Sequence, residues 1–148
     1  MITYYVDATN GSNGNVGYDI DAAFLTVARA LSICSEGDDI YLLTPVVEVV
    51  SISKNNITLT GNTVDGGILI ISADNVVLKT LKVINATNAI NIDSNSDSTK
   101  IDSDVYFVNN TTNILDNGTN TLIITGASAS ITEQDKLDIA QNVWDHVI

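Results

Sequence analysis

Residues 56–84 read NITLTGNTVDGGILIISADNVVLKTLKVI, in which short runs of β-branched and leucine residues alternate with Asn, Asp, Gly and Ser. The pair Asn56-Ile57 returns one unit later as Asn75-Val76. A unit of about 20 residues cannot bury its own apolar side chains, so it becomes stable only when the next unit stacks on it. This stretch therefore predicts stacked β-coils with an apolar interior and polar corners.

The same texture extends over residues 40–126, where the sequence has no helical periodicity. Self-similarity at about 20–25 residues is typical of a solenoid, and the LxxLxLxxN pattern of leucine-rich repeats is absent. The fold class expected is mainly β, a short right-handed parallel β-helix. Asn side chains in register are expected to form hydrogen-bonded ladders at its corners.

The predicted strands and interior columns follow directly from this pattern. The strands are Val46–Val50, Ile57–Leu59, Ile68–Ile71, Val76–Leu78, Leu81–Ile84, Ala89–Ile92, Val105–Val108 and Leu122–Ile124. One column of equivalent positions is expected to continue from Ile57 and Val76 to Ile101 and Leu122, and a second joins Ile68, Ile90 and Ile114.

Both ends of the chain differ from the coils in their pattern of apolar and polar residues. Apolar residues at helical spacing predict an N-terminal capping helix over residues 20–34, with Asp19 or Asp21 at its start and Gly37 after its end. After a small-residue linker at 126–130, residues 131–148 predict an amphipathic C-terminal helix with Thr132 as N-cap. The domains expected are a capped β-helix over 1–126 and a linker with a docking or oligomerisation helix over 127–148. The interface residues predicted on that helix are Leu137, Ala140, Val143, Trp144 and Val147.

The charge balance excludes several classes of function. The chain has 148 residues, with 18 acidic against 6 basic residues and a formal net charge of −12. Such a chain has no basic stripe for nucleic-acid phosphates and no affinity for anionic membrane surfaces. One His and one Cys exclude a His/Cys-rich zinc site within one chain, and no apolar run is long enough to span a membrane. No cofactor is expected.

The strongest metal-binding signal is the D-x-N-x-D spacing of Asp93, Asn95 and Asp97, with Asp102 and Asp104 following. These oxygen ligands fit the first half of a calcium loop, and Asp104 falls at its twelfth position. Ser98 replaces the turn glycine, and the flanks are predicted strands where an EF-hand requires helices. The alternative is a charged surface loop between coils, which needs no metal.

The supply of catalytic residues is poor. Arg29 is the single arginine and falls on the predicted N-terminal helix, whereas Lys54, Lys79, Lys82 and Lys100 are scattered along the coils. Lys79 and Lys82 could flank a groove or could simply occupy solvated strand positions. We therefore expect a protein that is not an enzyme. His146 is expected to be a helix-end residue, Cys34 a small core residue, and Trp144 either a packing residue or an interface anchor.

The N-terminal segments YYVDATNGSNG and AAFLTVARALSICSEGDDIYLL resemble the opening of pectin-lyase-like parallel β-helix proteins. In that family a Tyr-Tyr-Val strand and a polar loop precede a helix that plugs the open end of the β-helix. The family's usual Gly-x-Tyr after the first strand is replaced here by Thr44-Pro45-Val46-Val47. The resemblance implies the fold and supplies no matching catalytic residues. The matching positions are Tyr4, Tyr5, Val6, Gly11, Asn13, Gly14, Phe24, Thr26, Ala30, Gly37, Asp38, Ile40 and Tyr41.

The C-terminal segment SITEQDKLDIAQNVWDHVI is similar to the final helix of tailed-bacteriophage virion proteins, with residues 139–145 as the matching part. This resemblance implies a structural component of the phage particle, such as a capsid decoration, fibre or tail-associated protein. We expect it in the virion, as a homo-oligomer, in particular a trimer, in contact with other virion proteins. The alternatives are a glycan-binding or glycan-cleaving β-helix that recognises a host surface, and a bacterial surface or repeat protein. For sugar stacking, only Tyr106 and Phe107 offer aromatic rings within the coils after Tyr41.

Overall fold

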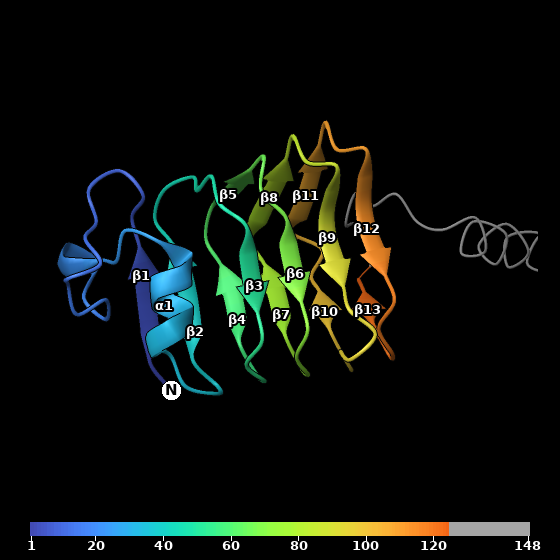
Figure 1. Cartoon of the computed structure of the whole chain (residues 1–148), viewed down its shortest axis with the longest axis horizontal. Coiled ribbons are helices and arrows are strands. Elements are labelled where there is room, and N and C mark those ends of the chain that lie inside the picture. The colour runs from blue at the N-terminus through green and yellow to red at the C-terminus, as the bar shows by residue number, and fades with distance from the viewer. Residues whose placement is uncertain (125–148) are drawn as a thin grey trace, which may run out of the picture.

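The computed structural model describes residues 1–124, which form thirteen short strands, one 3-10 turn and one α-helix (Figure 1). The strands lie in three sheets. Sheet A contains β1 (Thr3–Val6), β2 (Asp39–Leu42), β4 (Thr58–Thr60), β7 (Val77–Lys79), β10 (Lys100–Ile101) and β13 (Leu122–Ile123). Sheet B contains β5 (Thr63–Asp65), β8 (Leu81–Ile84) and β11 (Val105–Val108). Sheet C contains β3 (Val50–Ile52), β6 (Leu69–Ile71), β9 (Asn88–Ile92) and β12 (Thr112–Asp116).

From β4 onward the chain visits sheets A, B and C in rotation, and every strand pair in the three sheets is parallel. Each of these later circuits adds one strand to each sheet, whereas the first circuit, β2 and β3, meets sheet B only through an isolated bridge from Val46 to Val64. The result is a parallel β-solenoid of about four turns. The coils follow one another along the long axis of the molecule, with β1 at one end and β12 and β13 at the other (Figure 1). The prediction of a mainly β, parallel β-helical fold is confirmed.

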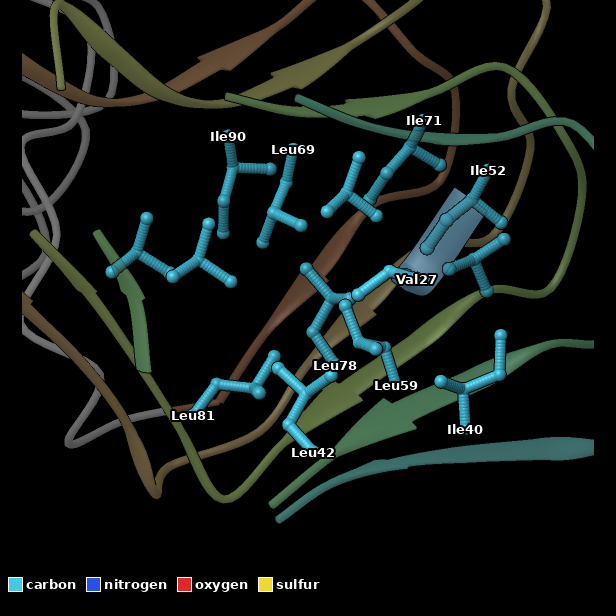
Figure 2. Packing of buried hydrophobic residues seen from close by; sticks show 14 of the residues in the cluster. Val27, Ile40, Leu42, Ile52, Leu59, Leu69, Ile71, Leu78, Leu81 and Ile90 are labelled. Carbon is cyan, nitrogen blue, oxygen red and sulfur yellow. The ribbon is translucent and has the colours of Figure 1, made fainter. Parts of the chain in front are cut away.

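One continuous apolar core fills the solenoid (Figure 2). Strand residues alternate between the two faces of a sheet, and the inward positions hold branched aliphatic side chains. In sheet A the register places Ile40 beside Leu59, Leu59 beside Leu78, and Leu78 beside Ile101, and all four side chains have no solvent exposure. Because each coil buries its residues against the coils on both sides, the hydrophobic effect stabilises the stack as a whole.

The predicted interior columns are partly wrong in register. Ile101 pairs with Leu78 where the sequence predicts Val76, and the next residue of that column is Ile123 where the sequence predicts Leu122. Leu122 points outward and is 55% exposed. In sheet C, Ile90 pairs with Ile114 as predicted but with Leu69 in place of Ile68. Corner length varies from coil to coil, and a slip of one residue moves a side chain to the opposite face, so a fixed period cannot locate the register.

Asparagine ladders form at the corners, as predicted. Between sheets B and C, Nδ2 of Asn85 donates to Oδ1 of Asp65 (2.8 Å), and Nδ2 of Asn109 donates to Oδ1 of Asn85 (2.7 Å). Asn85 and Asn109 have φ near +59° and +57°, a left-handed conformation that Asn tolerates better than most residues. The amide side chain therefore serves both the turn and the contact with the next coil.

The N-terminal helix is shorter than predicted. Residues 20–34 divide into a 3-10 turn, η1 (Ile20–Ala22), and α1 (Val27–Ile33). Asp19 caps only η1, whereas α1 is capped by Thr26, whose Oγ1 accepts from the Arg29 amide (3.1 Å). Phe24 interrupts the helix because its backbone is extended and bonds to β1, donating to Tyr5 O (2.9 Å) and accepting from Asp7 N (2.8 Å). Local spacing could not reveal this long-range pairing.

The C-terminal predictions lie outside the described residues. These are the amphipathic helix, the domain boundary after residue 126, His146, and the interface residues Leu137, Ala140, Val143, Trp144 and Val147. Within residues 1–124, no helix is long and apolar enough to cross a bilayer. Cys34 is buried, as predicted, and burial raises the pKa of its thiol.

Thr99 offers a first test of the register. The residue is 1% exposed and occupies the position equivalent to Val76 in the next coil. Its Oγ1 has no hydrogen-bond partner among residues 1–124. Since a buried hydroxyl without a partner costs about 1–3 kcal/mol, Thr99→Val is expected to raise the free energy of unfolding by about 1 kcal/mol in urea denaturation. Thr121, at the equivalent position of the next coil, donates to Oδ1 of Asp116 (2.9 Å), so Thr121→Val is expected to lower it. Equal effects of the two variants would contradict this account.

Candidate functional site

A surface groove of about 280 Å³ lies at the corner between sheets A and B. We call it the Tyr106 groove. Its lining comes from three successive coils and includes a turn from each of them and the outer face of sheet B. The polar and aromatic residues that line it are Asn62, Thr63, Thr80, Lys82, Asp104 and Tyr106. Two further grooves, one beside Asp93 and one beside Glu48, are lined by a carboxylate but by no cation or aromatic ring.

The outer face of sheet B supplies the wall of the Tyr106 groove. In this sheet Val64, Val83 and Phe107 point inward and are buried. The residues that precede them point outward and lie in register, Thr63 beside Lys82 and Lys82 beside Tyr106. Neighbouring strands are about 4.8 Å apart, so the three side chains form a continuous outward row. Lys82 is exposed, and Tyr106 keeps 55% of its surface in solvent.

Asp104 and Thr80, which both line the groove, form a clamp between two coils. Oδ1 of Asp104 accepts from the Thr80 amide (2.8 Å), and Oδ2 accepts from Thr80 Oγ1 (2.7 Å). These bonds, the amide bond first, hold the pKa of Asp104 below its ordinary value. The carboxylate is therefore ionised at neutral pH, with both oxygens already accepting hydrogen bonds.

Thr80 itself has a strained backbone, with φ near +50°. The left-handed region is costly for a β-branched residue and persists only where the surroundings enforce it. Here the Asp104 clamp and a bond from the Gly61 amide to Thr80 O (2.9 Å) enforce it. Left-handed residues recur at the corners of this solenoid, as at Asn85 and Asn109, so this conformation of Thr80 belongs to the turn between sheets A and B.

The groove has the chemistry of a polar ligand site. The Tyr106 ring gives an exposed apolar surface with a phenolic hydroxyl, and Lys82 can donate up to three hydrogen bonds. Asn62 is already engaged, since Nδ2 donates to Leu43 O (3.2 Å) and Oδ1 accepts from Thr63 N (2.9 Å), so it shapes the turn. An aromatic surface beside hydrogen-bonding groups suits a ligand with one apolar face and many hydroxyls.

The predicted calcium residues are distributed among separate local contacts. Asp93 accepts from the Asn95 amide (3.0 Å), and Asp97 accepts from Ser98 Oγ (2.7 Å) and Asn120 Nδ2 (3.0 Å). Asp104 accepts from Thr80 in the previous coil. No three His, Cys, Asp or Glu side chains of residues 1–124 are gathered in a way that could hold a metal ion. In the structure these carboxylates cap turns and connect coils.

The predicted cationic residues have different positions. Lys82 lines the groove and Lys79 does not appear in its lining. Lys79 lies on sheet A, where its charge contributes a small part of the lowering of the Asp104 pKa. Arg29 lies on α1 with its guanidinium 5.7 Å from the centre of the Phe24 ring, so it is a packing residue. Lys54 Nζ donates to Cys34 O. Sequence reasoning misses the role of Asp104, because Thr80 is 24 residues away and only the coil register brings the two together.

Comparison with known proteins supports the fold. No protein-family profile matches the sequence, and a search of curated proteins finds no match. Among solved structures, a rhamnogalacturonan lyase is similar, with a TM-score of 0.65 at 16% sequence identity. The match covers 89% of this chain and 45% of the lyase, so the chain spans less than half of that protein. At this identity the likeness concerns the fold alone.

Proposed function

We propose that this protein is a carbohydrate-binding β-helix module, and that the Tyr106 groove is its binding site. The observation that carries the proposal is the outward row of Thr63, Lys82 and Tyr106, which lines one groove together with the clamped Asp104. Pyranose rings have an apolar face that stacks on aromatic rings and hydroxyls that need donors and acceptors at the edge. Tyr106 supplies the first, and Lys82, Thr63 and the groove backbone supply the second.

The structural neighbour supports the same class of ligand. Its name describes a lyase of rhamnogalacturonan, which is a polysaccharide, and its fold is similar to that of this chain. Among the alternatives predicted from sequence, the glycan-binding β-helix therefore has more support than the phage structural role. The virion location, the trimer and the phage partners depend on residues 131–148 and stay predictions.

We further propose that the module binds its ligand without hydrolysing glycosidic bonds. Glycoside hydrolysis commonly uses a pair of carboxyl groups, one of them protonated as general acid. The described lining of the Tyr106 groove holds one carboxylate, Asp104, whose pKa is lowered and whose oxygens both accept from Thr80. Such a group is a poor proton donor at neutral pH. Asp104 is thus better suited to holding Thr80 and the two coils together than to acting as a general acid.

A second proposal concerns the N-terminal end of the solenoid, which we infer is covered by the segment from η1 through α1. Val27 and Ala30 of α1 are buried in the common core. The carboxylate of Glu48 accepts from the Val27 amide (2.7 Å) and the Ala28 amide (3.3 Å), which fastens the start of the helix. The Phe24 backbone pairs with β1 along its outer edge. Covering such an edge prevents pairing with other chains.

Binding of plant and bacterial polysaccharides tests the proposed function. In affinity electrophoresis, the migration of the purified full chain is expected to be retarded by rhamnogalacturonan, polygalacturonate or a neutral glucan in the gel. Incubation of the protein with the polysaccharide that retards it is expected to release no reducing ends. Tyr106→Ala is expected to weaken that binding about fivefold or more, since a truncated aromatic anchor costs above about 1 kcal/mol.

Tyr18→Ala is the matched control for Tyr106→Ala. Tyr18 is 61% exposed and does not line the groove, so its loss is expected to leave binding unchanged. Circular dichroism and thermal unfolding establish that both variants are folded. Equal binding by Tyr106→Ala and wild type, or binding of none of the polysaccharides by the wild type, would contradict the proposal.

A further inference from the structure

A pair of tyrosines lies on the outer face of sheet A, beside the Tyr106 groove. Tyr5 of β1 and Tyr41 of β2 are in register, and their ring centres are 6.0 Å apart with an interplanar angle of 56°. Tyr41 is 38% exposed, so part of its ring faces solvent. We call this pair the Tyr5–Tyr41 platform. Neither ring is needed in the core, because Tyr4, Val6, Ile40 and Leu42 fill the inward positions of these strands.

Gly61 connects the platform to the groove. It lines the Tyr106 groove, and a Cβ placed on it would lie 3.1 Å from Cδ1 of Tyr41. The same Cβ would lie 2.6 Å from Leu42 O, and φ of Gly61 is +120°, so this position requires glycine. Gly61 therefore lies next to the Tyr41 ring and also lines the groove, so one residue joins the two sites.

The register also gives the direction of this path. Tyr41 lies on β2, and Tyr106 lies on β11, in the coil that begins with β10. In sheet A the two coils are separated by three strand spacings, from β2 through β4 and β7 to β10. The distance between the coils is therefore about 14 Å along the long axis. One sugar ring cannot reach both aromatic groups. A chain of several sugars can, if it lies along the solenoid axis across the coils.

We propose that the Tyr5–Tyr41 platform is a second stacking site of the carbohydrate-binding surface, and that the ligand is an extended oligosaccharide lying along the solenoid axis from Tyr106 to Tyr41. This inference rests on the proposed function and adds the length and direction of the ligand. Lys79 lies in the same outward column, next to Thr60 and therefore two positions from Tyr41, and gives the path a donor between the two aromatic sites. A short oligosaccharide occupies the Tyr106 groove alone.

The dependence of affinity on chain length tests this inference. The probes are a disaccharide and an octasaccharide prepared from the polysaccharide that the wild type retains, measured by isothermal titration calorimetry on the full chain. The wild type is expected to bind the octasaccharide about tenfold more tightly than the disaccharide. Tyr41→Ala is expected to remove that gain and to leave disaccharide binding unchanged, whereas Tyr106→Ala weakens binding of both probes.

Two further variants separate binding from stability. The cross-strand contact of Tyr5 with Tyr41 also stabilises the sheet, so loss of the Tyr41 ring can lower stability as well as binding. Tyr41→Thr removes the ring but keeps a side chain that favours strands. Threonine already occupies the equivalent position of the next coil, at Thr60. It is expected to behave as Tyr41→Ala in binding, and Tyr18→Ala as wild type. The inference is overturned if the wild type binds both probes with equal affinity, or if Tyr41→Thr still binds the octasaccharide more tightly than the disaccharide. In either case, disaccharide binding that depends on Tyr106 still supports the proposed function. Binding of neither probe by the wild type overturns both.

Discussion

Leu59→Ala is expected to lower the free energy of unfolding by about 2–5 kcal/mol, the range found when a buried leucine is truncated without collapse of the cavity. Leu59 has no solvent exposure and lies between Ile40 and Leu78 in the central column of sheet A. In a solenoid each coil is stabilised by its contacts with both neighbours, so this truncation weakens two interfaces at once. Urea denaturation followed by circular dichroism gives the change directly.

Leu122→Ala is the matched control for this prediction. It makes the same chemical change on the same sheet, but Leu122 points outward and is 55% exposed. Substitutions at exposed positions usually change stability by less than about 0.5 kcal/mol. A loss at Leu122 as large as that at Leu59 would mean that the register of sheet A is not the one described.

Gly67→Ala is expected to destabilise the protein by about 1–3 kcal/mol or more, because a Cβ at this position has no room. That atom would lie 1.9 Å from Glu48 O and 2.8 Å from Glu48 C, both of them backbone atoms that cannot rotate away. Moving Glu48 would in turn disturb its hydrogen bonds to the Val27 and Ala28 amides at the start of α1. We therefore expect a lower midpoint of thermal unfolding.

The neighbouring substitution Gly66→Asn is expected to keep the free energy of unfolding within about 0.5 kcal/mol of wild type, or to raise it. Gly66 has φ near +71°, and a Cβ added to it would have no atom within 4 Å, so an asparagine fits. It lies in register with Asn85, which already has this conformation. Asparagine at 66 would continue the corner pattern into one more coil. Similar losses for the two glycine variants would contradict this assignment of their roles.

The sequence predicted those parts of the fold that repeat. The β-branched runs, the Asn-led corners and the return of Asn56-Ile57 as Asn75-Val76 are local features, and they are sufficient for a parallel β-helix with Asn ladders. The predicted register is correct from Ile57 to Val76 and from Ile90 to Ile114. It fails at Leu122 and Ile68, because the lengths of the corners are set by how the chain turns in space.

The candidate site is only partly visible in the sequence. The sequence identifies Lys82 as a cation that could flank a groove, and Tyr106 as one of the few aromatic residues of the coils, but it gives no sign that the two are neighbours. Their meeting depends on the pairing of β8 with β11. Spacing from Asp93 assigns Asp104 to a calcium loop, whereas the fold places its carboxylate on Thr80 of the previous coil. Spacing along the chain cannot detect such a contact between coils.

By itself, therefore, the sequence determined that this chain forms stacked parallel coils with an apolar interior, because burial of one coil by the next follows from a local, repeated pattern. Only the tertiary structure decided which side chains share the outer surface. Thr63, Lys82 and Tyr106 form one row, and Tyr5 and Tyr41 form one pair, because residues far apart in the chain are brought about 4.8 Å apart by strand pairing. Unlike the core, the outer surface carries no periodic signal, since solvent accepts almost any polar residue there.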